Sequence, residues 1–399
     1  MKYCNNCVMP DTKPDLYFDA EGVCSACRSF QQRKVVDWTA RRAELDQILD
    51  RYRNQNGTNW DCIVPVSGGK DSTYQVIRML QLGMNPLCVT STTCHLSDIG
   101  RKNIENLKSL GVDYIEFSTN PLIRKKLNRF ALEQVGDISW PEHVSIFTIP
   151  VRAAVQFNVP LIIWGENAQN EYGGPAQARD NHVLDRRWLE EFGGLLGLRV
   201  SDLIGIHDIQ AKHLIPYTYP TDAELARGGV TGLYLGYFIP WDGYSNALIA
   251  QGFGFTTKTT IVEGSVVNYE NLDNYQTGIH DYFKYLKFGF GRATDIACVH
   301  LRRGRLTRQD AIELVTRHDG KFPWTYLDKP VDQILANIDM TVEQFIKICD
   351  RFTNKKIFAT DAKGNLIKDA QGNLTKLLHP SAQPIVPVKG SYVGAYSEL

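Results

Sequence analysis

The sequence predicts an α/β fold in which a parallel sheet carries helices on both faces, with a cysteine-rich N-terminal segment and a mostly helical C-terminal region. Apolar, strand-like runs alternate with helix-like segments between residues 62 and 164, which is the pattern of repeated βα units. A Ser-Gly-Gly-Lys-Asp-Ser turn at residues 67–72 joins the first of these strands to the first helix. Four cysteines crowd the first 27 residues, ahead of the first strand.

The chain has 399 residues, enough for two or three domains. We expect a metal-binding segment and a helix at residues 1–56, an ATP-binding sheet domain at 57–240, and a region at 241–399 that completes the active site. Acidic and basic residues number 44 each, which argues against nucleic acid or an anionic membrane as a partner. Since no apolar run reaches about 18 residues and no signal-peptide core is present, we expect a cytoplasmic protein without a membrane span.

The clustered cysteines form two Cys-x2-Cys pairs, Cys4 with Cys7 and Cys24 with Cys27. Doubled pairs at this spacing are typical of a structural tetrathiolate zinc site. Between them, residues 17–23 predict a short hairpin that returns the second pair to the first. Free thiols or a redox pair are the alternatives, and the doubling of the motif favours zinc.

The remaining elements follow from the periodicity of the apolar residues. Residues 37–52 have helical spacing, and the asparagine-rich residues 54–59 mark a domain boundary. The sequence then predicts strands at 62–66, 86–91, 114–118 and 160–164, and helices at 73–80, 99–110, 122–135 and 144–157. The pattern of residues 175–235 predicts individual helices and strands less clearly. Residues 342–352 predict an amphipathic helix, and two Asp-x-x-Gly-Asn copies, from residues 361 and 369, predict successive β-turns.

The turn after the first strand predicts an anion-binding site. A strand, a glycine turn and a helix bring several backbone N–H groups and the positive end of a helix dipole to one place. The six residues of the turn are Ser67, Gly68, Gly69, Lys70, Asp71 and Ser72. The glycines allow close approach of a phosphate, the hydroxyls donate hydrogen bonds, the lysine adds positive charge, and the aspartate is a candidate ligand for phosphate-bound Mg²⁺. The turn is shorter than a Walker A motif, and an ordinary helix-start turn is the alternative.

Ligands of parallel α/β sheets bind at the carboxyl ends of the strands, near the point where the strand order reverses. Three strand ends are therefore candidates for one pocket: the glycine turn, Thr90 with Ser91, and Gly165 with Glu166. We expect Thr90, Ser91 and Gly165 to help bind the nucleotide. Glu166 and the later Glu171 are candidates to bind magnesium or to orient a substrate hydroxyl. A solvated loop with helix-capping chemistry is the alternative for these acids.

The C-terminal region adds an aromatic stretch and a basic one. Residues 237–244 are expected to be core, with a substrate wall as the alternative. Further on, Lys287 and Arg292 flank a Phe-Gly-Phe-Gly segment. Two such cations could stabilise a pyrophosphate group as it leaves, so we expect both to be catalytic, together with Asp71 and Glu166. A solvated basic face is the alternative.

The glycine turn resembles the SGGxDS loop of the N-type ATP pyrophosphatases, the PP-loop family, which holds the β- and γ-phosphates while ATP is cut to AMP and pyrophosphate. Further stretches are Cys-Asn-Asn-Cys-Val-Met-Pro-Asp-Thr at 4–12, Gly-Val-Cys-Ser-Ala-Cys at 22–27, Gly-Glu-Asn at 165–167, Trp-Asp at 241–242 and Lys-Phe-Gly-Phe-Gly-Arg at 287–292. Together they resemble the N-acetyl sugar amidotransferase family of bacterial surface-polysaccharide and O-antigen biosynthesis, over residues 4–305. The resemblance implies an adenine nucleotide alpha-hydrolase-like fold.

The resemblance also implies a reaction that needs ATP and Mg²⁺. An acetamido oxygen of a nucleotide-linked or acidic N-acetyl sugar attacks the α-phosphate of ATP, pyrophosphate leaves, and ammonia then displaces AMP to give an acetamidino group. By the same resemblance Ser67, Gly68, Gly69, Asp71 and Ser72 bind the β- and γ-phosphates. The chain shows no glutaminase signature. The resemblance implies that ammonia comes from a separate glutaminase and an ammonia-channelling barrel, similar to the two subunits of imidazole glycerol phosphate synthase.

Two other functions fit parts of the pattern. A tRNA-thiolating enzyme of the same superfamily would share the loop and the zinc-type cysteines, but zero net charge and the absence of a Cys-x2-Cys pair among Cys62, Cys88 and Cys94 argue against it. A non-catalytic nucleotide-binding assembly protein would have no need to keep Ser67 and Asp71 together with the later basic pair. The sugar itself stays open between a nucleotide-linked diacetamido uronic acid and a nine-carbon diacetamido acid.

Overall fold

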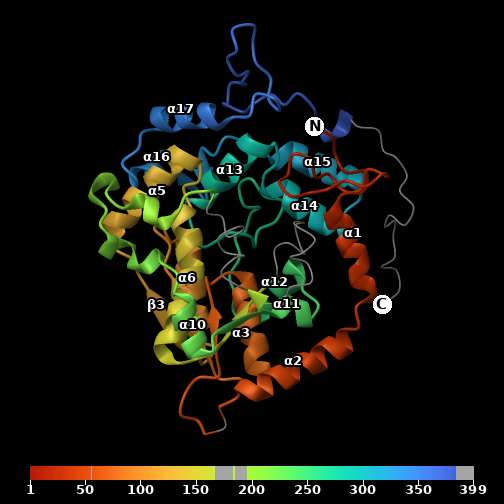
Figure 1. Ribbon diagram of the computed structural model, residues 1–399. Helices are drawn as coiled ribbons and strands as arrows, with labels where there is room; N and C mark the ends of the chain where they lie inside the picture. Colours follow the sequence, from red (N-terminus) through yellow and green to blue (C-terminus); the bar gives the residue numbers. More distant parts are fainter. Residues whose placement is uncertain (55, 167–182, 185–195, 383–399) are drawn as a thin grey trace.

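The computed structural model describes residues 1–54, 56–166, 183–184 and 196–382 (Figure 1). In this part of the chain, the main sheet has six strands in the order β3-β2-β1-β4-β6-β5. They are β1 (Cys62–Pro65), β2 (Pro86–Ser91), β3 (Asp113–Phe117), β4 (Leu161–Trp164), β5 (Val183–Leu184) and β6 (Thr231–Tyr234). All neighbours are parallel except β5, which pairs antiparallel with β6. The predicted parallel sheet is confirmed.

The strand order reverses at β1. The next strands along the chain, β2 and β3, lie on one side of it, whereas β4 and β6 lie on the other. Ile63 of β1 is in register with Leu87 of β2 and with Ile162 of β4. The carboxyl ends of these three strands therefore meet at one edge, where ligands of such sheets bind.

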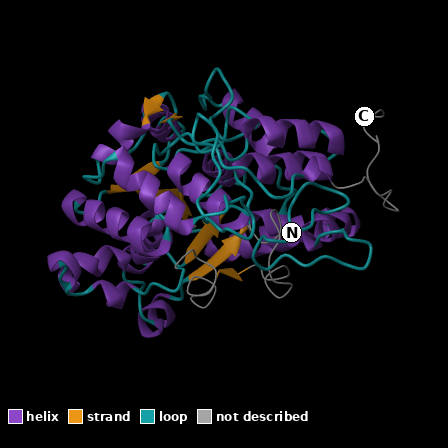
Figure 2. Ribbon diagram, turned by 90° about the horizontal axis from the view of Figure 1, so that it is seen from above, coloured by secondary structure: helices purple, strands orange, loops and turns teal. Residues whose placement is uncertain are grey.

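Alternate side chains of each strand point to opposite faces, and both faces are covered by helices. On one face, Cys62 and Val64 share a buried cluster with α2 (Trp38–Tyr52) and α3 (Lys70–Gln81). On the other, Ile63 and Leu87 pack in a cluster with residues of α6 (Trp140–Phe157). The strands accordingly lie among the helices in the view from above (Figure 2). A near-continuous apolar sequence is typical of strands buried on both sides.

The predicted helices are present, the last with the predicted ends and the others with shifted ends. They are α2, α3, α4 (Asp98–Lys108), α5 (Pro121–Val135), α6 and α17 (Val342–Phe352). Helix α3 begins at Lys70 rather than at residue 73, because Gly69 is its extended N-cap and the turn leads directly into the first helical turn. Helix α6 begins at Trp140 rather than at residue 144. Its first turn contains Pro141, a residue favoured at that position.

The N-terminal segment packs against the C-terminal region as well as the sheet. The predicted hairpin forms, with Phe18 bridged to Cys24, and leads into α1 (Ser25–Gln32). The cysteine segment shares a buried cluster with α14 (Arg292–Arg302) and α15 (Arg308–His318), and Figure 1 shows it beside these helices. Helix α2 instead packs on the sheet cluster.

The C-terminal region is mostly helical, as predicted. Besides α14, α15 and α17 it contains α12 (Gly243–Gly252), α13 (Thr277–Phe288) and α16 (Val331–Ala336), with a short hairpin of β7 (Thr325–Tyr326) and β8 (Lys329–Pro330). The predicted β-turns form, since Gly364 N donates to Asp361 O and Gly372 N to Asp369 O. Shorter elements are α10 (Asp222–Gly228), α11 (Leu235–Phe238) and 3₁₀ turns at Arg33–Val35, Val200–Leu203, Ile206–Asp208, Ala211–Tyr217 and Pro380–Ala382.

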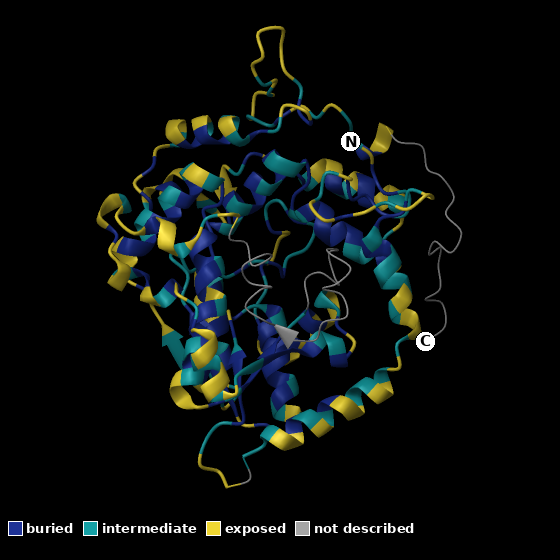
Figure 3. Ribbon diagram, viewed as in Figure 1, coloured by how far each residue is buried: buried dark blue, intermediate teal, exposed yellow. Residues whose placement is uncertain are grey.

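Burial follows this arrangement. Figure 3 shows helices with buried inner faces and exposed outer faces around the sheet, in which β2 and β4 are buried along their length and the edge strand β3 is not. The largest buried cluster joins α13, α16 and α17, with Phe283 and Phe345 almost fully buried. Among the described residues, no helix combines the length and the apolar character that a membrane crossing requires.

Candidate functional site

The glycine turn lies at the carboxyl end of β1, the strand at which the sheet order reverses. Gly68 has φ +79°, and a Cβ there would lie 2.9 Å from Cγ1 of Ile104 on α4. Only glycine combines this backbone conformation with such close packing. The turn is fixed internally, because Ser67 N donates to Ser72 Oγ at 3.3 Å and Ser72 Oγ donates to Gly69 O at 3.0 Å.

The turn opens into the first turn of α3, a helix of 12 residues. The first N–H groups of a helix have no intrahelical partner, and the helix dipole is positive at this end. The end of α3 therefore favours a bound anion next to Lys70.

A small cavity of about 20 Å³ lies at this place. Lys70 is buried, and its ammonium lies 2.6 Å from Asp71 Oδ2 and 2.7 Å from Glu270 Oε1. Asn246 Nδ2 donates to the other oxygen of Asp71 at 2.8 Å. The cavity is lined by Lys70, Asp71, Glu166, Trp241, Gly243, Tyr244, Tyr269, Glu270, Ile296, Val299, His300 and Arg305. It thus joins the glycine turn to residues far along the chain.

The C-terminal part of this lining includes a second cation in a fixed position. The guanidinium of Arg305 donates to both carboxylate oxygens of Asp242, at 2.7 and 2.9 Å, and to His300 Nδ1 at 2.9 Å. His300 Nε2 lies 3.1 Å from the hydroxyl of Tyr269. Burial and the nearby Arg305 lower the pKa of His300 to about 4, so the ring is neutral near pH 7. Since its Nδ1 accepts, its Nε2 carries the proton.

The other predicted strand ends lie at the same edge. Glu166, which follows β4, lines the cavity with Asp71, whereas the predicted Glu171 lies outside the described residues. Gly165 O accepts a hydrogen bond from Gly236 N. Thr90 and Ser91 are buried at the end of β2 and are not among the residues that line the cavity. Ser91 Oγ instead donates a hydrogen bond to Ser145 Oγ at 2.9 Å.

Lys287 is not brought to this cavity. Its ammonium donates to the carbonyl oxygens of Val135 and Gly136 at 2.6 and 2.9 Å, which caps the end of α5. Burial lowers the pKa of this ammonium. In the described part of the chain, the contacts of Lys287 are those of a structural residue.

Arg292 lines a different, larger cavity of about 270 Å³, and its guanidinium bonds to both oxygens of Asp281 at 3.1 and 3.2 Å. This second cavity has aromatic walls that include Tyr282 and Trp324. Arg292 is the first residue of α14, whereas Val299 of the same helix lines the smaller cavity. At 1.5 Å of rise per residue, the two positions lie about 10 Å apart along the helix axis.

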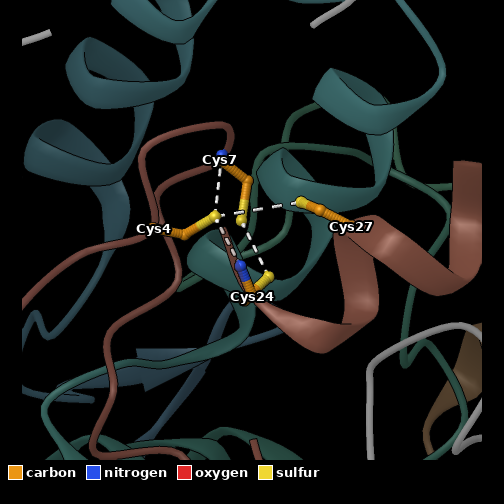
Figure 4. Close-up of side chains that lie close together, drawn as sticks. All are labelled: Cys4, Cys7, Cys24 and Cys27. Carbon is orange, nitrogen blue, oxygen red and sulfur yellow. Dashed lines mark hydrogen bonds between the residues drawn. The ribbon is translucent and has the colours of Figure 1, made fainter. Parts of the chain in front are cut away.

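The four clustered cysteines converge on one point (Figure 4). Sγ of Cys4 lies 4.0 Å from that of Cys27, and Sγ of Cys7 lies 3.8 Å from that of Cys24. Ligands of a tetrahedral zinc ion with bonds of about 2.3 Å are separated by about 3.8 Å. Backbone N–H groups of Cys7 and Cys24 donate to the sulfur of Cys4, as outer contacts of thiolate ligands do. The four buried side chains therefore fit a structural Zn²⁺.

Sequence reasoning missed Glu270, His300 and Asn246. None belongs to a motif, because each reaches the glycine turn through tertiary packing of the C-terminal region. Of the predicted residues, the structure brings Lys70, Asp71 and Glu166 into one cavity. Trp241, from the predicted aromatic stretch, also lines this cavity. The aromatic stretch thus serves both core and cavity.

The family comparison concerns the C-terminal region, which supplies part of the cavity lining. Residues 263–371 match the family described as "LPS biosynthesis protein WbpG-like, C-terminal domain". A search of curated proteins gives no match. Among solved structures, the chain is similar to "Structure of NMN synthetase from Francisella tularensis", with 14% identity, a TM-score of 0.27, and coverage of 54% of this chain and 87% of that chain. The WbpG-like match supports the resemblance to the N-acetyl sugar amidotransferase family.

Proposed function

We propose, from the WbpG-like domain at residues 263–371, that this chain uses ATP in lipopolysaccharide or related surface-glycan biosynthesis. More specifically, it converts an acetamido group of an N-acetyl sugar to an acetamidino group. The proposal combines the WbpG-like match with the loop motif and its position at the reversal of the sheet order.

One observation carries the proposal. The glycine turn and the WbpG-like domain line the same cavity, the former with Lys70 and Asp71 and the latter with Glu270 and Arg305. An anion held at the start of α3 would therefore face residues of the region that matches the WbpG-like family. A nucleotide-binding turn alone would not suggest a substrate, whereas this shared cavity does.

The proposed reaction has two steps. The acetamido oxygen attacks the α-phosphorus of ATP, the bond to the β-phosphate oxygen breaks, and pyrophosphate leaves. Ammonia then attacks the imidate carbon, the carbon–oxygen bond breaks, AMP leaves with that oxygen, and one proton of the ammonia passes to solvent. Adenylation is needed because an amide oxygen is a poor leaving group.

We assign the charged groups of the cavity as follows. Lys70 and Arg305 stabilise charge on the departing pyrophosphate, because preorganised cations in a small buried site lower the barrier. Mg²⁺ would bind to phosphate oxygens and to one or two of the carboxylates of Asp71, Glu166 and Glu270, which are ligands it prefers. The predicted catalytic role of Lys287 and Arg292 stays a prediction.

We further propose that ammonia comes from a glutaminase and a channelling barrel that bind this chain as separate subunits. The proposal rests on the family resemblance and on the absence of a glutaminase signature in the sequence. Glutamine-dependent product formation by this chain alone would contradict it.

The cysteines of the sheet favour this reaction over tRNA thiolation. Cys62 and Cys88 are fully buried in β1 and β2, and burial raises the pKa of Cys88 to about 12. Burial likewise raises the pKa of Cys94, the next cysteine, to about 12. A sulfur carrier needs an accessible thiolate, which none of these three side chains provides near pH 7.

The deciding experiment measures pyrophosphate release from ATP with Mg²⁺, ammonium chloride and a panel of acetamido sugars, including a nucleotide-linked diacetamido uronic acid. We expect release that depends on one sugar class, and a product in which NH replaces O by mass spectrometry. Asp71→Asn serves as the inactive control. ATP cleavage that responds to tRNA and not to any sugar would refute the assignment.

A further inference from the structure

Three side chains from separate elements meet beside the end of α5, away from the four cysteines. Asp137 lies in the connection between α5 and α6, His143 in α6, and His280 in α13. Their ligand atoms all lie within 4.8 Å of one another. We propose that Asp137, His143 and His280 bind one Zn²⁺ ion, at a site separate from the cysteine site and independent of the proposed function.

The distances fit such a site. Nδ1 of His280 lies 2.8 Å from Asp137 Oδ1, and Nδ1 of His143 lies 3.3 Å from Asp137 Oδ2. Ligands at about 2.0–2.1 Å from a tetrahedral zinc ion are separated by about 3.3 Å. The three groups are thus close to the required spacing without any movement of the backbone.

One of the three candidate ligand atoms makes no hydrogen bond and is held only by an ion-pair contact. Nδ1 of His143 is buried and makes no hydrogen bond, although the carboxylate of Asp137 is near. Asp137 Oδ1, in contrast, accepts from His280 and from Ser139 N. The long contact of His143 with Asp137 satisfies the buried nitrogen poorly, whereas a metal ion between the two groups would bind both.

The surroundings favour a cation and allow it to enter. The carboxylates of Glu142 and Asp281 favour positive charge at His143, while the ammonium of Lys287 interacts electrostatically with Asp137. The Asp137 side chain is only 5% exposed, whereas the two imidazoles are 28% and 25% exposed. The ion would therefore reach the buried carboxylate of Asp137 from the side of the two partly exposed imidazoles.

The donor set selects the ion. Two imidazoles and one carboxylate suit Zn²⁺ with a water molecule in the fourth position. The same set also suits Fe²⁺ when further positions are open, which metal analysis distinguishes. The ion would tie α13, which lies in the WbpG-like domain, to the α5–α6 connection of the sheet domain.

The test is the zinc content of the full-length protein after incubation with ZnSO₄ and gel filtration. Wild type is expected to retain about two zinc ions per chain, whereas His280→Asn and His143→Gln are expected to retain about one. The control, His213→Asn, replaces a histidine that accepts from Gln210 N outside the cluster, and it should keep the wild-type content.

Cobalt substitution keeps the result clear if a variant folds poorly. Sulfur-to-cobalt charge transfer arises only from the cysteine site, so His280→Asn should keep that absorption band and lose only cobalt bound by nitrogen and oxygen. Two results would overturn the proposal: one zinc ion per wild-type chain that is lost in Cys24→Ser, or His280→Asn with as much zinc as wild type. The three side chains would then form an ion-pair network alone.

Discussion

The ammonium of Lys70 lies 2.7 Å from a carboxylate oxygen of Glu270, although the two residues come from distant parts of the chain. Lys70 belongs to the first turn of α3, whereas Glu270 belongs to the WbpG-like domain. The charge that would meet a phosphate is thus held in place by a carboxylate of the WbpG-like domain.

Replacing this lysine tests the cavity directly. Lys70→Met is expected to lower the rate of ATP-dependent pyrophosphate release on the order of 100-fold, because the leaving group loses a preorganised cation. Initial-rate assays with saturating sugar measure the effect. Lys102→Met, which removes an exposed lysine of α4, is the matched control. Equal rates for wild type and Lys70→Met would place the nucleotide elsewhere.

Gly68→Ala is expected to destabilise the protein for two reasons. The residue must keep φ +79°, which costs about 1–2 kcal/mol for an L-residue, and its Cβ would crowd Ile104. Gly111→Ala is the control, because φ is +86° there and no heavy atom lies within 4 Å of the added Cβ. Urea unfolding of both variants should show a loss larger by about 1–3 kcal/mol for Gly68→Ala. Equal losses of unfolding free energy in the two variants would mean that Ile104 moves away from the added Cβ at no cost.

The pair formed by Asp242 and Arg305 predicts a pH dependence. Burial alone would raise the pKa of Asp242, but Arg305 and Arg303 hold it well below its usual value. Asp242→Asn should therefore lower the free energy of unfolding by about 2 kcal/mol near pH 7. This contribution is complete above the unfolded pKa of about 3.9 and is lost as pH falls toward the lower folded pKa.

Denaturant unfolding near pH 7 and near pH 3 measures this contribution, and the gap between wild type and Asp242→Asn should narrow at the lower pH. The control is Asp46→Asn, which removes an exposed carboxylate that pairs with Arg42. Its effect should stay within about 1 kcal/mol at both pH values. A gap that widens in acid would reject the assigned ionisation.

Metal removal should affect the cysteine segment first. Cys24→Ser is expected to abolish zinc binding at the cysteine site and to lower the melting temperature, since this small segment draws its folding free energy from the metal. Cys298→Ser is the control, because Cys298 packs in the same cluster without belonging to the four-cysteine group. Elemental analysis and calorimetry check both variants. Retained thiolate-bound metal in Cys24→Ser would exclude the four-sulfur site.

Lys287→Met separates the predicted catalytic role from the observed capping role. Loss of two hydrogen bonds to the end of α5 should lower the free energy of unfolding by about 1–2 kcal/mol. The contacts predict little change in the rate of pyrophosphate release. Lys347→Met, on the exposed side of α17, is the control. A large rate loss with unchanged stability would restore the catalytic role.

The local features of the fold were predictable. The strands β1, β2 and β4 are short apolar runs with breakers on each side, and the Cys-x2-Cys spacing indicated the four-sulfur cluster before any geometry was known. Both signals depend on neighbours in sequence. The same holds for the Asp-x-x-Gly-Asn turns at residues 361 and 369.

The composition of the site was predictable only in part. Lys70 and Asp71 follow from the turn, whereas Glu270 and His300 reach the cavity through packing of α12–α14 that no spacing encodes. Lys287 shows the opposite case. Its position in a basic, glycine-containing stretch indicated phosphate binding, but Gly289 ends α13 in the left-handed conformation, and the lysine in that last turn meets carbonyl groups of α5.

Helix α14 has the cysteine segment on one side and the cavity on another. Cys298 and Leu301 pack with the metal-binding residues, while Val299 and His300 line the cavity. During translation, the cysteine segment leaves the ribosome before the sheet strands, whereas α14 and α15 follow only after them. The apolar residues of the cysteine segment therefore lack these packing partners until α14 and α15 are made. The cavity at the glycine turn, which is also lined by His300 and Arg305, forms only then.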